Sequence, residues 1–251
     1  MAREDSVREP AAGITGAVAR RFAEELAQRG GPVRQQIASM LRELGAVDRA
    51  IYSAVAATPT PALDEPLRRL SDAANYSRLW LAIAAGLGVT GGKAGRRAAT
   101  RGTVAIGVTS ALVNLAVKSA WSRQRPDRSG ARVPVQRKVR MPASTSFPSG
   151  HAASGFAFAA AVGRDLPWLG LALRFLAATV AYSRVHTGVH YPGDTVAGAL
   201  IGEGTGQSVA GLMDRLAARR SSRRGRGNQR DLPDGADTED AMIPAPGQQT
   251  G

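Results

Sequence analysis

Apolar positions recur with a helical period through the first 70 or so residues of the chain. Two amphipathic helices are predicted between about residues 17 and 56, separated by the sequence RGGP. Their apolar faces are formed by Val18, Phe22 and Leu26 in the first helix and by Ile37, Met40, Leu41 and Leu44 in the second. We expect both to pack on the rest of the protein, with contact to a membrane surface as the alternative. The sequence TPTPALDEP then interrupts the pattern, and Asp64 is expected to cap a short helix that carries Leu67 and Leu70.

After Arg78 the pattern changes to longer uncharged stretches. They cover residues 79–92, 102–117 and 152–163, and two further stretches, 166–183 and 195–213, contain one charge each. None has the roughly 18 to 20 consecutive apolar residues of an unambiguous membrane span. Several nevertheless end in Lys or Arg, and glycine recurs at every fourth position, a spacing that lets membrane helices approach closely. These glycines are Gly198, Gly202 and Gly206.

The pattern predicts an all-α fold, a helical bundle with about five to six membrane-embedded helices and N-terminal amphipathic helices; a soluble bundle of short helices rich in alanine and glycine is the alternative. Three segments are expected: an amphipathic helical segment over 1–78, a helical membrane domain over 79–213, and a basic, then polar, disordered tail over 214–251. Residues 1–15 lack the basic-then-apolar order of a secretory signal peptide, so no cleavable targeting segment is predicted.

The charge of the chain limits the classes of binding partner that are expected. The formal net charge is +13, which points to nucleic acid, an anionic membrane surface or a phosphorylated substrate. The basic residues gather in 93–101, 118–140 and 215–230, but no nucleic-acid recognition motif accompanies them, so no specific nucleic acid is expected as a partner. The chain has no cysteine, which excludes disulfides, thiolate catalysis and cysteine-ligated zinc.

Lys118 and Arg125 form the first group with candidate chemistry. They are seven residues apart, about two helical turns or 10 Å, and Pro126 ends the pattern directly after them. Both cations would thus lie on one side of a helix and could face one anion. A solvated, snorkelling helix end is the alternative.

The second group is Ser149, Gly150 and His151, at the start of a helix rich in alanine. Serine is a preferred helix cap, and a helix N-terminus offers unpaired N–H groups and the positive end of the helix dipole. Such a helix start is suited to binding a phosphate group, and His151 would lie beside that phosphate. An ordinary capped helix with an exposed histidine is the alternative.

The third group is the sequence SRVHTGVHYPGD, in which His190 precedes Asp194 by four residues and Arg184 supplies another cation. A carboxylate at the start of a helix can accept a hydrogen bond from one ring nitrogen of the histidine and leave the other nitrogen free to attack. Two alternatives stay open: a purely structural His–Asp pair, and a metal site that also includes His186. Gly188 and Pro192 argue against a regular helix through this segment, so the spacing does not favour the metal site.

The three groups in this order resemble the type 2 phosphatidic acid phosphatase and vanadium haloperoxidase superfamily. Its signature of Lys-x6-Arg-Pro, Pro-Ser-Gly-His and Ser-Arg-x5-His-x3-Asp is matched without a gap, and the resemblance covers about residues 79–213. It implies that His190 attacks phosphorus and becomes a phosphohistidine, that Asp194 orients it, and that His151 protonates the leaving oxygen. It also implies a phosphate-binding set without metal or cofactor and without a role for His186. That set is Lys118, Arg125, Ser149, Gly150 and Arg184.

The resemblance therefore implies a membrane-associated phosphatase acting on a lipid phosphate or pyrophosphate, such as phosphatidic acid, phosphatidylglycerol phosphate or a polyprenyl pyrophosphate. Its partners would be that lipid and the bilayer. If the basic loop 93–101 and the tail lie in the cytoplasm, a multi-pass protein of the inner or plasma membrane has its site on the extracytoplasmic face. The alternatives are a soluble nonspecific acid phosphatase, a vanadate-dependent haloperoxidase, and a non-catalytic protein that binds membranes or nucleic acid through its arginine-rich tail.

Overall fold

The computed structural model describes residues 31–118 and 123–230, leaving out the side chains of 32–34 and 223–230. The first predicted helix, with Val18, Phe22 and Leu26, lies outside these residues. The chain divides into two compact units, Met1–Gly211 and Leu212–Gly251. Every site residue discussed below belongs to the first unit.

The described residues form helices and loops only, which confirms the all-α prediction. Proline opens α2, α3 and α8, a position where its fixed φ suits the helix and its missing N–H is not needed. The elements in chain order are α2 (Pro32–Ala57), α3 (Pro61–Ala73), the 3-10 turn η1 (Asn75–Ser77), α4 (Arg78–Thr90), α5 (Gly92–Ala111), the π-helical η2 (Leu112–Val117), the 3-10 turn η3 (Val135–Arg137), α7 (Gly150–Gly163), α8 (Pro167–His186) and α9 (Pro192–Arg230).

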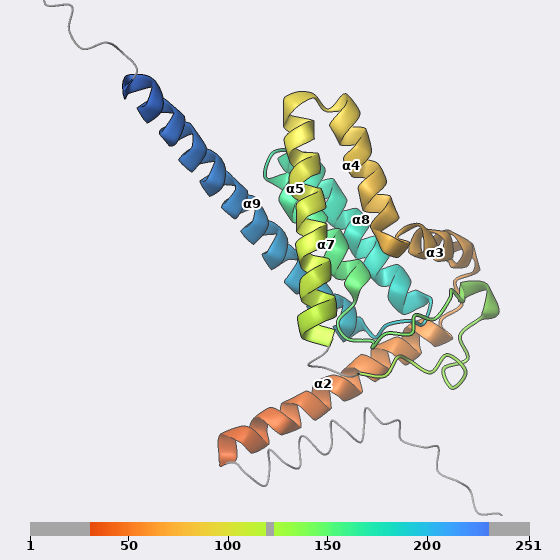
Figure 1. The fold of residues 1–251 in the computed structure, drawn as a ribbon. Coiled ribbons are helices and arrows are strands. Elements are labelled where there is room, and N and C mark those ends of the chain that lie inside the picture. Colours follow the sequence, from red (N-terminus) through yellow and green to blue (C-terminus); the bar gives the residue numbers. More distant parts are fainter. Residues whose placement is uncertain (1–30, 119–122, 231–251) are drawn as a thin grey trace, which may run out of the picture. The chain divides into compact units, whose positions relative to one another are not determined.

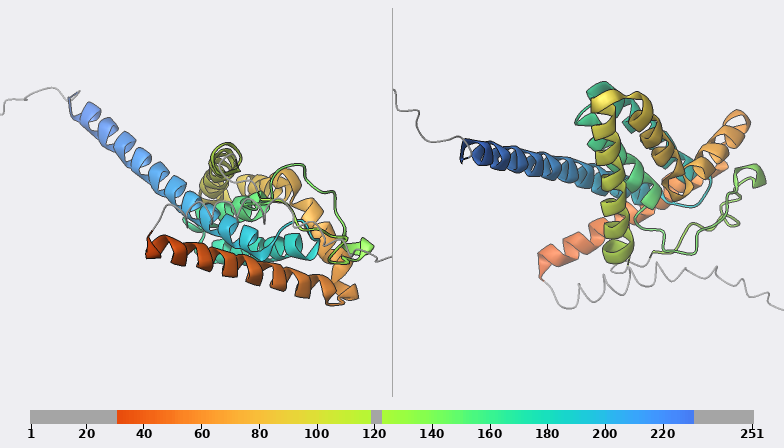
Figure 2. Two further views of the ribbon diagram at one scale, coloured as in Figure 1. Left: turned by 90° about the horizontal axis from the view of Figure 1, so that it is seen from below. Right: turned by 45° about the horizontal axis from the view of Figure 1, so that its top comes forward.

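Helices α4, α5, α7 and α8 lie side by side, and α2 crosses this group at the end where α5 finishes (Figure 1). Seen from below, α5 points nearly along the line of sight while α2 lies lengthwise, so α2 runs crosswise to the bundle (Figure 2). The core is built around Trp80 of α4 and Phe158 of α7, whose ring centroids are 5.9 Å apart. Small residues allow this packing: a Cβ on Gly155 would lie 2.7 Å from the Trp80 ring.

Helices α7 and α9 touch backbone to backbone. Gly198, Gly202 and Gly206 of α9 lie so close to α7 that a Cβ at any of them would overlap a carbonyl oxygen of that helix. The three oxygens belong to Ser149, Ala153 and Ala157, again four residues apart. The glycine spacing seen in the sequence therefore fixes the register of α9 against α7.

Helix α2 packs on the rest of its unit as predicted, but through a different face. Its buried apolar residues are Ala38, Tyr52 and Ala56. The predicted apolar row is turned away from the protein and is exposed, and two further residues extend it. This row consists of Ile37, Met40, Leu41, Leu44, Val47 and Ile51.

Two charged segments that were predicted to be non-helical are helical in the structure. The basic segment 93–101 is not a loop but the first half of α5, because Ala, Lys and Arg favour helix and Arg101 pairs with Asp165 at 3.3 Å. Likewise α9 continues through the basic segment to Arg230, so the disorder predicted from residue 214 is wrong for 214–230. Asp64 lies in the first turn of α3, which begins after Thr60, instead of capping it.

One stretch among the described residues is long and apolar enough to cross a membrane: Gly92–Val117, formed by α5 and η2 together. The other four uncharged stretches coincide with α4, α7, α8 and the first part of α9.

Candidate active site

His190 lies in the short loop between α8 and α9 and is 2% exposed. Its Nε2 atom is 3.3 Å from Nη1 of Arg125. Because a guanidinium group can only donate, Nε2 acts as the acceptor and the ring proton belongs on Nδ1. Nδ1 faces Oδ2 of Asp194 at 3.4 Å. The geometry therefore favours the tautomer that leaves the Nε2 lone pair directed toward the cations.

The Asp194 carboxylate is fully buried in the first turn of α9 and held from several sides. It accepts hydrogen bonds from the Tyr191 backbone N–H at 2.9 Å, from the Ser146 hydroxyl, and from Nη1 of Arg123 at 2.7 Å. A carboxylate with these partners stays ionised and fixed in orientation, which lets it direct the imidazole of His190.

Burial lowers the pKa of His190 to about 4. The Asp194 carboxylate raises this pKa, and the charges of Arg125 and Arg184 lower it. The imidazole is consequently neutral near pH 7. A neutral imidazole has the lone pair that nucleophilic attack requires.

The two cations of the first motif meet at one side chain, but Arg125 lies in an irregular segment and not on the predicted helix. Nζ of Lys118 and Nη2 of Arg125 each lie 3.2 Å from the hydroxyl oxygen of Ser144. Arg125 is held further by the carbonyl oxygens of Ser144 at 2.9 Å and Val189 at 2.8 Å. Its guanidinium therefore bridges the loop before α7 and the loop that carries His190.

Arg184, on the last turn of α8, is 1% exposed. Its Nη1 donates to the Ser71 hydroxyl at 2.5 Å, while its buried Nε has no hydrogen-bond partner among the residues that the structure describes. A buried donor without an acceptor is rare and suits a site that awaits a ligand oxygen. The carbonyl oxygen of Arg184 accepts the backbone N–H of His190 at 3.2 Å, so the same residue helps to position the histidine.

Ser149 caps α7 as predicted, accepting the backbone N–H of Ala152 at 3.4 Å. Its own N–H donates to the carbonyl oxygen of Asp194 at 2.9 Å, which ties the second motif to the third. Gly150 begins α7, and no other part of the described chain lies within 4 Å of where its Cβ would be, so the described residues leave the first turn open at this point.

His151 follows on α7, and its Nε2 lies 2.9 Å from Oδ1 of Asn75 in η1. It is close enough to Lys118, Arg125, Arg184 and His190 for their charges to act on it. The structure thus brings the predicted residues of all three motifs into one region.

His186 belongs to a different cluster. Its Nε2 lies 2.9 Å from the Thr60 hydroxyl and 3.2 Å from Oδ1 of Asp64, which also accepts from Nε of Arg137 at 2.8 Å. The metal alternative required His186 to join His190 and Asp194. Within the described ranges, no three His, Asp or Glu side chains are arranged to hold a metal ion.

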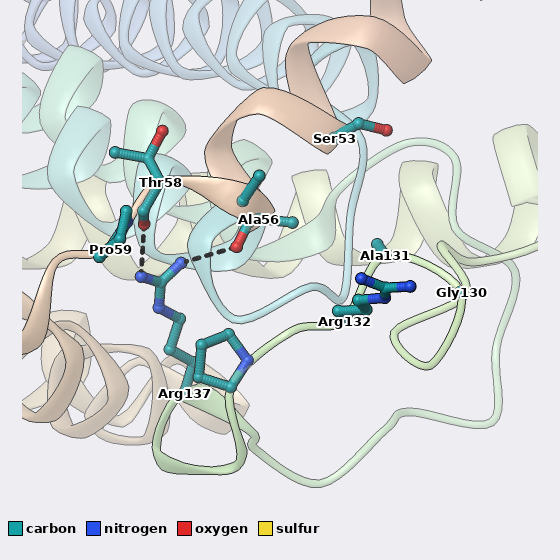
Figure 3. Close-up of a pocket in the computed structure, with 10 residues that line it drawn as sticks. Ser53, Ala56, Thr58, Pro59, Gly130, Ala131, Arg132 and Arg137 are labelled. Atoms are coloured by element: carbon teal, nitrogen blue, oxygen red, sulfur yellow. Dashed lines mark hydrogen bonds between the residues drawn. The ribbon is translucent and has the colours of Figure 1, made fainter.

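A cavity of about 480 Å³ lies beside the end of α2 and the loop 130–137 (Figure 3). Arg137 reaches into it, but its Nη2 donates to the Thr58 carbonyl at 2.7 Å and its Nη1 to that of Ala56 at 3.5 Å. None of the eight predicted site residues lines this cavity. Of the two arginines that line it, Arg137 is occupied by backbone oxygens, and Arg132 has no motif residue beside it in the cavity lining, so the candidate site remains the one around His190.

Several residues that hold the site were not found from the sequence. Arg123 and Ser146 lie inside or beside the motifs, at positions that the signature leaves free. Asp48, Ser71 and Asn75 come from α2, α3 and η1, ahead of every motif, and no local pattern links them to it. Their roles depend on contacts between distant parts of the chain.

A buried, neutral histidine that faces a carboxylate and several cations, within an all-α fold, is a site whose charges suit an anionic group. The chain belongs to the PAP2 superfamily, whose family model matches residues 99–216. This confirms the resemblance given by the three motifs.

Similar proteins agree with this assignment. Decaprenylphosphoryl-5-phosphoribose phosphatase of Mycobacterium tuberculosis strain H37Rv is 38% identical over 107 residues, which cover 41% of this chain and 56% of that protein. The protein of the same name from Mycolicibacterium smegmatis is 34% identical over 134 residues, 52% of this chain and 68% of that one. The chain thus spans little more than half the length of the M. tuberculosis relative.

Among solved structures, the fold is similar to that of the transmembrane PAP2-type phosphatidylglycerolphosphate phosphatase from Bacillus subtilis. The TM-score is 0.54 at 21% identity, with 80% of this chain and 97% of that chain covered. This likeness concerns the fold.

Proposed function

We propose that this chain is a phosphatase that hydrolyses a lipid phosphate or pyrophosphate through a phosphohistidine on His190. The observation that carries the proposal is the state of His190: its Nε2 is an acceptor beside Arg125, and its Nδ1 faces Asp194. The Nε of Arg184, which has no partner within residues 31–118 and 123–230, adds a buried donor in the same site. An oxygen-rich, dianionic phosphoryl group fits these donors.

In the first step, Lys118, Arg125 and Arg184 bind the phosphoryl oxygens together with the first-turn amides of α7. The Nε2 lone pair of His190 forms a bond to phosphorus while the bond from phosphorus to the leaving oxygen breaks. His151 enters this step with both ring nitrogens protonated and transfers one of these protons to the leaving oxygen, so His151 becomes neutral and the alcohol or phosphate leaves neutral at the cleaved position. Asp194 stabilises the positive charge that the His190 ring gains.

In the second step, water attacks the phosphorus of the phosphohistidine. His151 accepts a proton from this water, the nitrogen–phosphorus bond breaks, and inorganic phosphate leaves with His190 again neutral. Neither step needs a metal ion, because the cations of the protein already neutralise the phosphoryl charge.

A lipid substrate and a membrane location are supported by the outer surface of the first unit. Large apolar side chains are exposed on several of its helices, and the apolar row of α2 runs crosswise to them, as suits a helix in the membrane interface. Those on the bundle include Val104, Val108, Leu112, Leu115, Phe175 and Leu200. The names of the mycobacterial relatives make a polyprenyl-phosphoryl pentose 5-phosphate a first candidate substrate.

The test is phosphate release by the detergent-purified protein with EDTA present. The substrates are a decaprenylphosphoryl pentose 5-phosphate, phosphatidic acid, a polyprenyl pyrophosphate and a small soluble ester, and the variant is His190→Ala. We expect release that persists in EDTA, is lost in the variant by at least about a thousandfold, and is fastest for one of the lipids. A preference for the soluble ester would point to the nonspecific acid phosphatase, and no release from a folded protein would overturn the proposal.

For the orientation, we propose a multi-pass protein of the cell membrane with the site on the extracytoplasmic side. The support is the basic start of α5, which lies at the opposite end of Gly92–Val117 from Lys118. Because the chain has no cysteine, single cysteines at the exposed positions Arg96 and Ser129 can be labelled selectively. A membrane-impermeant maleimide should label Ser129→Cys in intact cells and Arg96→Cys only after lysis; the reverse result would invert the orientation.

A further inference from the structure

Helix α2 contributes a carboxylate to the active site from outside the region that the family model matches. Nη2 of Arg123 donates to Oδ2 of Asp48 at 2.5 Å, and Nη1 of the same guanidinium donates to Oδ1 of Asp194 at 2.7 Å. Asp194 in turn faces His190. A continuous chain of polar contacts therefore runs from α2 to the predicted nucleophile.

Asp48 also holds the backbone next to Asp194. Its Oδ1 accepts the N–H of Gly193 at 2.6 Å, and a Cβ on Gly193 would lie 3.1 Å from Oδ2. The carboxylate is 9% exposed, so both of its oxygens are used in a largely buried setting. It thus fixes the first turn of α9 as well as the guanidinium.

Aromatic rings keep the guanidinium in its place. Arg123 lies over the ring of Tyr191, 4.2 Å from its centroid. Tyr191 meets Tyr52 edge to face, with ring centroids 5.4 Å apart. Tyr52 is four residues after Asp48 on the same face of α2, so one helix supplies both the carboxylate and the ring that support Arg123 and Tyr191.

The net charge of the three side chains explains what the second carboxylate, Asp48, contributes. Asp48, Arg123 and Asp194 together carry one net negative charge, which is available to the His190 ring when it becomes positive. Without Asp48, the remaining pair of Arg123 and Asp194 has no net charge. Arg123 then binds Asp194 alone and competes with the His190 ring for that carboxylate. In a buried site such a change acts strongly, because solvent does not screen it.

We propose that Asp48, acting through Arg123, is a positioning residue that keeps Asp194 oriented and negatively charged toward His190. The kinetic part rests on the proposed phosphatase function, whereas the orientation of the imidazole can be measured without any activity.

The kinetic test compares Asp48→Asn, Asp48→Glu and the matched control Glu43→Gln, an exposed acid on the same helix. For Asp48→Asn we expect kcat for phosphate release to fall by about tenfold to a hundredfold, with KM within about threefold. Asp48→Glu restores the charge and should recover part of kcat, and Glu43→Gln should match the wild type. Equal kcat for Asp48→Asn and wild type would overturn the proposal.

A double variant separates positioning by charge from a merely structural role. Asp48→Asn combined with Arg123→Gln leaves Asp194 as the only charge of the three, so the net negative charge returns. We expect the double variant to have a higher kcat than Asp48→Asn alone. If the contacts mattered only for folding, losing both partners would lower activity and melting temperature further, and that result would overturn the proposal.

The activity-independent readout is the tautomer of His190, measured at pH 7 from the ¹⁵N shifts of its ring nitrogens. The chain has three histidines, so His190→Ala assigns the signal. We expect a single Nδ1–H tautomer in the wild type and in Glu43→Gln, and a mixture in Asp48→Asn. A wild-type protein without phosphatase activity would defeat the proposed function alone, whereas an unchanged tautomer in Asp48→Asn would defeat the role of Asp48.

Discussion

The side-chain oxygen of Asn75 lies 2.9 Å from Nε2 of His151, so a turn ahead of all three motifs holds the proposed general acid. Asn75 is itself oriented, because its amide nitrogen donates to Asp72 at 3.3 Å. This leaves the asparagine oxygen to accept the Nε2 proton of the histidine. The amide therefore decides which ring nitrogen of His151 carries the proton in the resting site.

Removing this contact should impair proton transfer more than phosphate binding. We expect Asn75→Ala to lower kcat about tenfold for alkyl phosphates, whose leaving oxygens need a proton, and by less than about threefold for an aryl phosphate with an acidic leaving group. The measurement is the ratio of kcat for the two esters. Tyr76→Phe in the same turn is the control, since Tyr76 is largely exposed; an equal loss for both esters would contradict the prediction.

The pH dependence follows from the pKa of His190, which burial lowers to about 4. Protonation removes the Nε2 lone pair, so kcat/KM should fall about tenfold per pH unit below that value and should not respond to this group between about pH 5 and 7. Initial rates from pH 3 to 7 check this, with two esters of different phosphate pKa to separate ionisation of the substrate. An enzyme ionisation near 6.5, the ordinary value for histidine, would show that the imidazole is better solvated than the structure has it.

The seam between α7 and α9 should not tolerate a methyl group. In Gly202→Ala the new Cβ meets the carbonyl oxygen of Ala153, so the helices must separate, and we expect a loss of about 1–3 kcal/mol in the free energy of unfolding together with most of the activity. Gly204→Ala is the control on the same helix, because nothing lies within 4 Å of its Cβ. Thermal unfolding in detergent measures both; similar melting temperatures for the two variants would show that the contact is looser.

The Arg137 cluster should be structural. Arg137 is 1% exposed, donates to Asp64 at 2.8 Å and binds the Thr58 carbonyl at 2.7 Å, so Arg137→Ala leaves a buried carboxylate with fewer partners. We expect a destabilisation of about 3 kcal/mol and an unchanged kcat per folded molecule. Unfolding curves and active-site titration check this against Lys138→Ala, an exposed neighbour. A selective fall in kcat would place the cluster in the reaction instead.

The proximity of the residues within the second and third motifs was predictable because each of these two motifs is local. Ser149, Gly150 and His151 start a helix, and His190 and Asp194 stand on either side of another helix start, so their proximity in sequence already implies proximity in space. What links one motif to the next was not predictable. The contact between Asp48 and Arg123 spans 75 positions and that between Asn75 and His151 spans 76, and no residue pattern over such distances indicates which polar groups meet.

The helices, too, could be predicted from some segments of the sequence and not from others. The uncharged stretches from residue 79 to 213 correspond to helices, since apolar runs of this length and composition have few other ways to satisfy their backbone. The segments read as loop or disorder on account of charge, 93–101 and 214–230, are helical. Charge indicates solvent contact, but alanine, lysine and arginine keep a high helix propensity there. The face by which α2 packs was also missed, because Asp48 and small alanines occupy it.

Three of the residues that hold the active site, Asp48, Ser71 and Asn75, precede the region that carries the signature. Some of the groups that position the candidate reacting residues are therefore encoded outside the signature region. Transplanting residues 99–216 into another scaffold would carry over every motif but remove the partners that Asp48, Ser71 and Asn75 provide to Arg123, Arg184 and His151. Conversely, redesigning the first helices alone, with the signature residues left untouched, should change the rate of the proposed reaction.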